Sequence, residues 1–170
     1  AYSSSISKSI HEGYGVHRTY DEMMRDFEYM NRLIELFDEE GLTFCYHNHY
    51  HEFITVYHGV NAFDRMLYNV DSRLKFDLDV GWVTSGGYDP VEVLKRLEGR
   101  IGKIVEKYPS SKEGFTAVGT GVVNIPGVLK ELDRQSVEYA CVEQDIMRNL
   151  NPREALTMSY LAMKESGYVW

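Results

Sequence analysis

The sequence has little of several features that would place it in other classes of protein. It holds two cysteines in 170 residues, Cys45 and Cys141, which is too few for a disulfide framework. Both lie in apolar, strand-like runs, so we expect two reduced, buried thiols. Basic residues are also fewer than acidic residues, with 18 Lys and Arg against 26 Asp and Glu, which gives a formal net charge of −8. That balance disfavours nucleic acid and anionic membranes as partners, because both require clustered cations.

Long apolar runs are absent too. The runs extend over a few residues only, which predicts that no segment spans a membrane. The first residues, 1–6, include no basic segment and no long apolar segment, so we expect no secretory signal. Together with the sparse cysteines, this predicts a cytoplasmic protein.

What remains is an ordinary globular composition, with 44% hydrophobic and 26% charged residues. These proportions argue against disorder and against a coiled coil. The length is sufficient for one domain with a hydrophobic core, so we interpret residues 1–170 as a single domain.

Helical and strand patterns alternate along the chain. Thr19 and Glu22 form a capping box, after which apolar residues recur at helical spacing. Later helices are expected to open at Asn61, Asp89–Pro90, Pro126 and Asn151–Pro152. Strands are expected near Ala1–Tyr2 and over Leu42–His47, Leu74–Asp79, Arg100–Val105 and Val137–Glu143. Such alternation predicts right-handed crossovers and a parallel sheet.

Polar residues collect where three of these strands end, at 47–49, Asp79 and Glu143. In parallel α/β folds, and in (β/α)8 barrels especially, that edge carries the chemistry. A complete barrel takes ~250 residues, so we expect the C-terminal half of a TIM barrel. It would hold about four strands, besides the one that ends near Ala1–Tyr2, and five helices. The rest of the barrel is expected from residues beyond this sequence or from a partner, and we expect a homo-oligomer.

The segment Tyr46–Phe53 concentrates imidazoles. His47 and His49 share strand parity, so both are expected to point to one side of the sheet. Such a pair at a barrel mouth suits a divalent metal or a substrate hydroxyl, although two packed, hydrogen-bonded histidines remain the alternative. Asn48 is a candidate substrate contact, and Glu52 is a further candidate for the site.

Two aspartates lie on the next strand. Asp79 is a candidate metal ligand, and its alternative is a cap on the following helix, which the turn-like stretch 84–87 and the separate cap Asp89 disfavour. Asp77 shares its parity but lies deeper, and we expect it to pair with a buried cation. Trp82 could form a wall against which a sugar stacks.

Glu143 ends the last strand. With Asp79 and His47 it would form a mixed oxygen and nitrogen ligand set, suited to one divalent Mn, Co, Zn or Mg ion. The alternative is a solvated or helix-capping acid.

Four segments together resemble the xylose isomerase-like TIM barrels, and within them the sugar phosphate isomerase/epimerase and inosose isomerase/dehydratase group. They read Tyr46-His-Asn-His, Leu78-Asp-Val-Gly-Trp-Val, Gly119-Thr-Gly and Val142-Glu-Gln-Asp. The resemblance covers residues 16–168. It is specific for the superfamily and says little about the substrate.

The resemblance implies one divalent metal held by four side chains, usually Glu, Asp, His and Glu. It places His47 at the first ligand position, Asp79 at the second and Glu143 at the last, with Glu52 close to a substrate contact. The third position departs from the pattern. Members carry a His-x-Lys-Asp-like motif there, whereas this chain keeps Lys107 and has no histidine after residue 58.

The leading hypothesis is a metal-dependent isomerase or epimerase of a small keto-sugar, sugar phosphate or inosose, acting through an enediolate. Glu143 or Glu52 would remove the α-proton as general base, and the metal, His49 and Lys107 would hold the enediolate. Asn48 and Trp82 would bind substrate. The alternatives are a dehydratase on a similar substrate and a non-catalytic sugar-binding barrel that has lost its metal. A DNA phosphodiesterase is disfavoured by the net charge.

Overall fold

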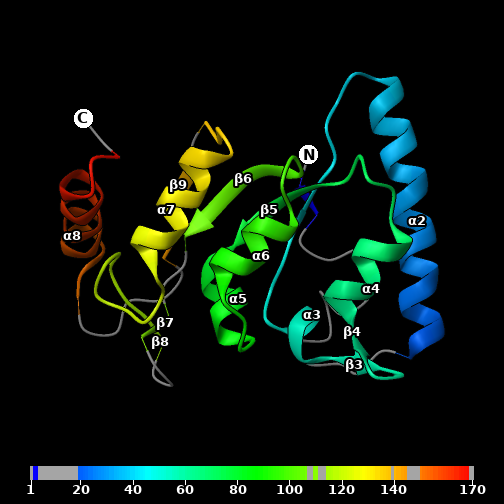
Figure 1. Ribbon diagram of the computed structural model, residues 1–170, viewed down its shortest axis with the longest axis horizontal. Coiled ribbons are helices and arrows are strands. Elements are labelled where there is room, and N and C mark those ends of the chain that lie inside the picture. Colours follow the sequence, from blue (N-terminus) through cyan, green and yellow to red (C-terminus); the bar gives the residue numbers. More distant parts are fainter. Residues whose placement is uncertain are drawn as a thin grey trace.

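The computed structural model describes residues 2–3, 19–106, 109–110, 114–138, 140–144 and 150–168 (Figure 1). Its centre is a five-stranded sheet in the order β1-β2-β5-β6-β9, in which every neighbouring pair is parallel. The order across the sheet follows the order along the chain. That is the arrangement of a barrel wall, whereas a doubly wound sheet reverses direction at a switch point.

The strands confirm the expected positions, and three of them, β2, β5 and β9, are shorter than expected. The strands are β1 Tyr2–Ser3, β2 Cys45–His47, β5 Lys75–Asp79, β6 Ile101–Glu106 and β9 Ala140–Val142.

The expected helices are present, and each begins at a capping side chain. They are α2 Tyr20–Glu39, α4 Ala62–Asn69, α6 Pro90–Arg96, α7 Ile125–Arg134 and α8 Pro152–Glu165. Helix α7 begins one residue before Pro126, because the Asn124 side chain accepts a hydrogen bond from the Gly127 amide. Helices α2 (blue) and α8 (red) stand at opposite ends of the molecule, with the sheet, α6 and α7 between them (Figure 1). None of the helices described is both long and apolar enough to cross a bilayer.

Several short elements were not predicted. They are the helices α3 His51–Ile54 and α5 Val80–Ser85, the hairpin of β3 Val56–Tyr57 with β4 Val60–Asn61, and the hairpin of β7 Pro109–Ser110 with β8 Gly114–Phe115. Each is too short to show a hydrophobic period.

The core lies between the sheet and its helices. The apolar stripe expected on α2 consists of Met23, Phe27, Met30, Ile34 and Phe37. The first four are buried, and Phe37 is partly buried against the core. The stripe joins fully buried side chains from the strands and the other helices, including Phe63, Phe76, Leu78, Leu94 and Leu129.

The expectation of two buried cysteines is wrong. Cys45 is half-buried and Cys141 is exposed. Cys141 lies on β9, which is the last strand of the sheet among the described residues, so no described strand covers that edge.

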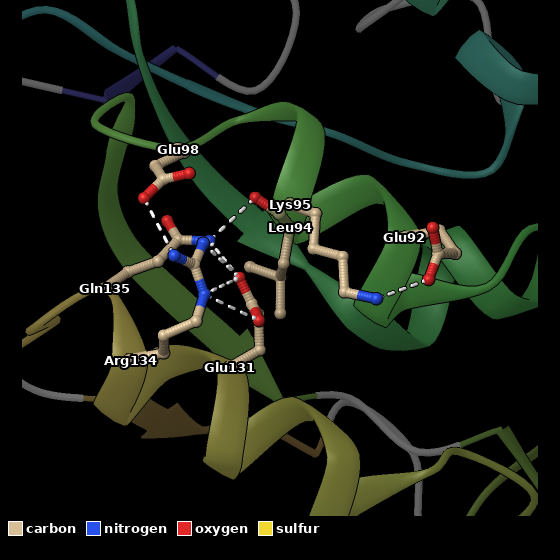
Figure 2. Close-up of polar contacts among 7 residues, drawn as sticks. All are labelled: Glu92, Leu94, Lys95, Glu98, Glu131, Arg134 and Gln135. Atoms are coloured by element: carbon tan, nitrogen blue, oxygen red, sulfur yellow. Dashed lines mark hydrogen bonds and ion pairs between the residues drawn. The ribbon is translucent and has the colours of Figure 1, made fainter.

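A polar network ties α6 to α7 (Figure 2). The Arg134 guanidinium donates to both carboxylate oxygens of Glu131 and to Glu98. Gln135 Nε2 donates to the Leu94 carbonyl at 2.9 Å and to Glu131 Oε1 at 2.7 Å. The hydrogen bonds from Arg134 and Gln135 lower the pKa of Glu131. This network holds together two of the helices that pack beside the central strands.

Candidate metal centre

Three side chains converge at the carboxyl edge of the sheet. His47 is the last residue of β2, Asp79 is the last residue of β5, and Glu143 directly follows β9. One ligand atom from each lies within 4.8 Å of the other two. Parallel strands end at the same edge of a sheet, which is why residues far apart in sequence meet here. The three expected metal ligands are therefore neighbours.

These residues fit a divalent metal. His47 Nε2 and Asp79 Oδ2 are 3.8 Å apart. An ion that lies ~2.1 Å from each ligand atom bridges a gap of up to about 4.2 Å, so one ion can contact both. A mixed set of imidazole and carboxylate suits Zn, Mn or Co, and three protein ligands are the number that catalytic zinc sites use.

The Asp79 carboxylate has two tasks. Its Oδ1 accepts a hydrogen bond from the Trp82 amide at 2.9 Å and caps α5, while its Oδ2 faces His47. The cap, which the sequence disfavoured, is thus present. The reason is that a helix, α5, begins directly after Asp79 in a stretch expected to be a turn.

The His47 ring lies between two aspartates. Its Nδ1 is 3.9 Å from Asp77 Oδ2, and its Nε2 is 3.8 Å from Asp79 Oδ2. His47 and both aspartates are buried. The sequence predicts a cation beside Asp77, and the structure places an imidazole there, which is a cation when protonated.

Asn48 holds the main chain of Asp79. Its Oδ1 accepts from the Asp79 amide at 2.8 Å, and its Nδ2 donates to the Asp79 carbonyl at 3.1 Å. Both residues are 0% exposed. The predicted contact between Asn48 and substrate stays a prediction.

Glu52 shapes the segment after β2. Its Oε1 accepts from the Tyr46 hydroxyl at 2.6 Å, and its Oε2 accepts from the His49 amide at 3.0 Å. Burial raises the pKa of Glu52 to about 7, and hydrogen bonds to the carboxylate only partly oppose that rise. Its role as a general base stays a prediction.

Aromatic and imidazole rings gather beside the cluster. The His49 ring centroid is 5.2 Å from that of His47 and 5.6 Å from that of Trp82, so the two histidines do share one side. Tyr50 and His51 join them, with 5.6 Å between Tyr50 and Trp82 and 4.0 Å between Tyr50 and His51. Burial lowers the pKa of His51. Neither Tyr50 nor His51 was predicted to lie at the site. The closely spaced aromatic and imidazole residues that follow Tyr46 in the sequence could have indicated it.

Of the two remaining expected site residues, the structure describes Glu143, whereas Lys107 lies outside the described residues. Glu143 is partly buried, and its neighbour Gln144 donates to the Thr116 carbonyl at 3.0 Å, which anchors the chain just after β9. Sugar stacking on Trp82 stays a prediction.

Comparison with known proteins places the fold. No family model and no curated protein matches the sequence. A solved structure of a sugar phosphate isomerase/epimerase from Parabacteroides distasonis matches with a TM-score of 0.75 and 23% identity, over 91% of this chain and 57% of that one. The chain has part of a TIM-barrel fold.

Two other solved structures agree. The probable 3-DHS dehydratase AsbF from Bacillus anthracis matches with a TM-score of 0.64 and 17% identity, over 86% of this chain and 57% of that one. The IOLI protein with a bound zinc atom matches with a TM-score of 0.65 and 13% identity, over 91% of this chain and 60% of that one. The expected fold class is confirmed, and this chain spans little more than half the length of these barrels. The expectations of a single domain, a homo-oligomer and a cytoplasmic location stay predictions.

Proposed function

We propose that this chain carries the metal-binding edge of an isomerase or epimerase for a small keto-sugar, sugar phosphate or inosose. The observation that carries the proposal is the convergence of His47, Asp79 and Glu143 within 4.8 Å at the carboxyl edge of a parallel sheet. The sugar phosphate isomerase/epimerase and the zinc-containing IOLI protein, which share the fold, support it.

A bound Mn, Co, Zn or Mg ion would act as a Lewis acid toward a substrate carbonyl and the adjacent hydroxyl, which makes the α-proton acidic. The residues of the chain would then move that proton. Glu143 would take it as general base. Return of the proton to the neighbouring carbon would give isomerisation, whereas epimerisation would need a second acid that protonates the same carbon from the opposite face.

Glu143 suits the base role better than Glu52. Both carboxylate oxygens of Glu52 accept hydrogen bonds from Tyr46 and His49, so its first task is to hold the segment after β2 in place. Glu143 contributes an oxygen to the ligand cluster itself. A general base must lie within hydrogen-bond reach of the proton that it removes, and a substrate bound at the cluster would be within reach of Glu143.

The rings beside the cluster would receive the substrate. Trp82 would offer an apolar face to the sugar ring, and His49 would donate a hydrogen bond to a substrate oxygen. The centroids of the two rings are 5.6 Å apart, so one substrate would be able to contact both rings.

A dehydratase is the second candidate. The same removal of an α-proton, followed by loss of a β-hydroxyl as water, gives dehydration. The observation that favours it is the shared fold with the 3-DHS dehydratase AsbF. Assays should therefore follow both ketose interconversion and the formation of an unsaturated product.

The test is metal binding by the purified chain together with turnover. We expect about one Mn, Co or Zn ion per chain, and we expect Asp79→Asn to weaken binding at least ~10-fold because a ligand charge is lost. Asp89→Asn is the matched control, because Asp89 also caps a helix, through the Val91 amide, without joining the cluster. Asn retains the capping oxygen in both variants.

The outcomes separate the alternatives. Glu143→Ala should abolish turnover, and unchanged turnover would remove Glu143 from the mechanism. A wild-type chain that binds no divalent metal would refute the metal-dependent proposal and favour a non-catalytic sugar-binding barrel.

A further inference from the structure

We propose that Asn48 is a positioning residue for the metal centre: its side chain ties the end of β2 to the end of β5 and so holds Asp79 opposite His47. This inference rests on the proposed metal site. It differs from the role that the sequence suggests for Asn48, which is contact with substrate.

The pairing of the two strands shows why such a tie is needed. Strands β2 and β5 pair from Cys45 and Lys75 up to His47 and Asp77. Beyond His47 the chain leaves the sheet and enters α3, whereas β5 continues for two residues to Asp79. Asp79 pairs with Val105 of β6 on its other side, but it lies past the last backbone pairing with the strand that carries His47.

The Asn48 amide takes over that pairing. Its oxygen accepts from the Asp79 N–H at 2.8 Å, and its nitrogen donates to the Asp79 carbonyl at 3.1 Å. An amide side chain presents one acceptor and donors side by side, which matches the N–H and C=O of one residue in a β-ladder. Both residues are 0% exposed, so water does not compete for these bonds.

These hydrogen bonds also fix the direction of the Asp79 carboxylate. With its main chain held by Asn48 and its Oδ1 held by the Trp82 amide, Asp79 has its Oδ2 directed at His47, 3.8 Å away. Groups that orient metal ligands in this way set metal affinity without contacting the ion.

The test is Asn48→Leu, which retains the volume of the side chain and removes both hydrogen bonds. Titration calorimetry with Zn²⁺ and with Mn²⁺ should show binding weakened about 10- to 100-fold. The matched control is Asn61→Leu. Asn61 is also buried and also makes two hydrogen bonds, accepting from the Asp64 amide and donating to the Tyr88 hydroxyl, both at 2.7 Å, but it is not part of the cluster. We expect the control to bind metal like the wild type, although it loses stability.

Amide hydrogen exchange in the metal-free protein gives a second measurement, at the Asp79 N–H. We expect this proton to be protected in the wild type and to exchange at least ~10-fold faster in Asn48→Leu. If the wild type binds no metal, the proposed function fails and the exchange rate alone decides whether Asn48 holds Asp79.

Three results would overturn the inference. They are an unchanged Asp79 exchange rate in Asn48→Leu, metal affinity equal to that of Asn61→Leu, or a raised KM for substrate with unaltered metal affinity. The last result would assign Asn48 to substrate binding instead.

Discussion

Replacing Glu52 with glutamine should stabilise the protein at neutral and alkaline pH. The structure places this carboxylate in a setting that raises its pKa from an ordinary 4.5 to about 7. The folded protein therefore binds the proton more tightly than the unfolded chain does. It follows that Glu52 contributes most to stability below about pH 4.5, and that this contribution falls as the pH rises to about 7.

The size of the effect follows from the shift. Each pKa unit corresponds to about 1.4 kcal/mol, so the ionised carboxylate costs about 3 kcal/mol at most above pH 7. Glutamine preserves the contacts of the protonated acid, because its oxygen can accept from the His49 amide and its nitrogen can donate to the Tyr46 hydroxyl oxygen.

The assay is urea unfolding of the wild type and Glu52→Gln at several pH values from 4 to 8.5. The difference between their free energies of unfolding should grow from near zero at pH 4 to a plateau above pH 7. Glu28→Gln, on the exposed face of α2, is the control and should show no such growth. A difference between wild type and Glu52→Gln that stays constant with pH would refute the reasoning.

Two other predictions concern packing and helix ends. Gly86→Ala should lower the free energy of unfolding by about 1–3 kcal/mol, because its new Cβ would lie 2.6 Å from the Phe53 Cβ. Thermal or urea unfolding measures this change. Unchanged stability would mean that Phe53 moves without cost to make room for the methyl group. Gln135→Ala should cost about 1 kcal/mol, because it removes hydrogen bonds to the Leu94 carbonyl and to Glu131. Gln135→Glu, which lacks the donor, should cost at least as much, and a neutral result for both would show that this tie between α6 and α7 adds no stability.

The longer elements were predictable because their signals are local. Capping side chains such as Thr19 and Asn151 mark helix starts, and the stripe from Met23 to Ile34 marks the buried face of α2. The polar residues at the ends of β2, β5 and β9 could be placed together from the sequence, because parallel strands share one carboxyl edge.

The remaining features depend on tertiary contacts that no local pattern encodes. Helix α3 has four residues, and its Glu52 finds its partners in Tyr46 and the His49 amide only once the chain has turned after β2. The exposure of Cys141 depends on which strand lies beside β9 rather than on the apolar run around it. The hydrogen bonds of Asn48 to Asp79 join residues 31 positions apart, so composition could suggest only that Asn48 is polar and near the site.

Asp79 shows why two interpretations of one residue need not compete. Each carboxylate has two oxygens, and here one caps α5 while the other faces His47. The amide that receives the cap belongs to Trp82, so the same hydrogen bond that orients the candidate ligand also places the indole, whose ring lies 5.6 Å from His49. The order Asp-Val-Gly-Trp therefore joins a candidate ligand and a candidate substrate wall through one turn of helix. Any change that shifts the start of α5 should disturb both together.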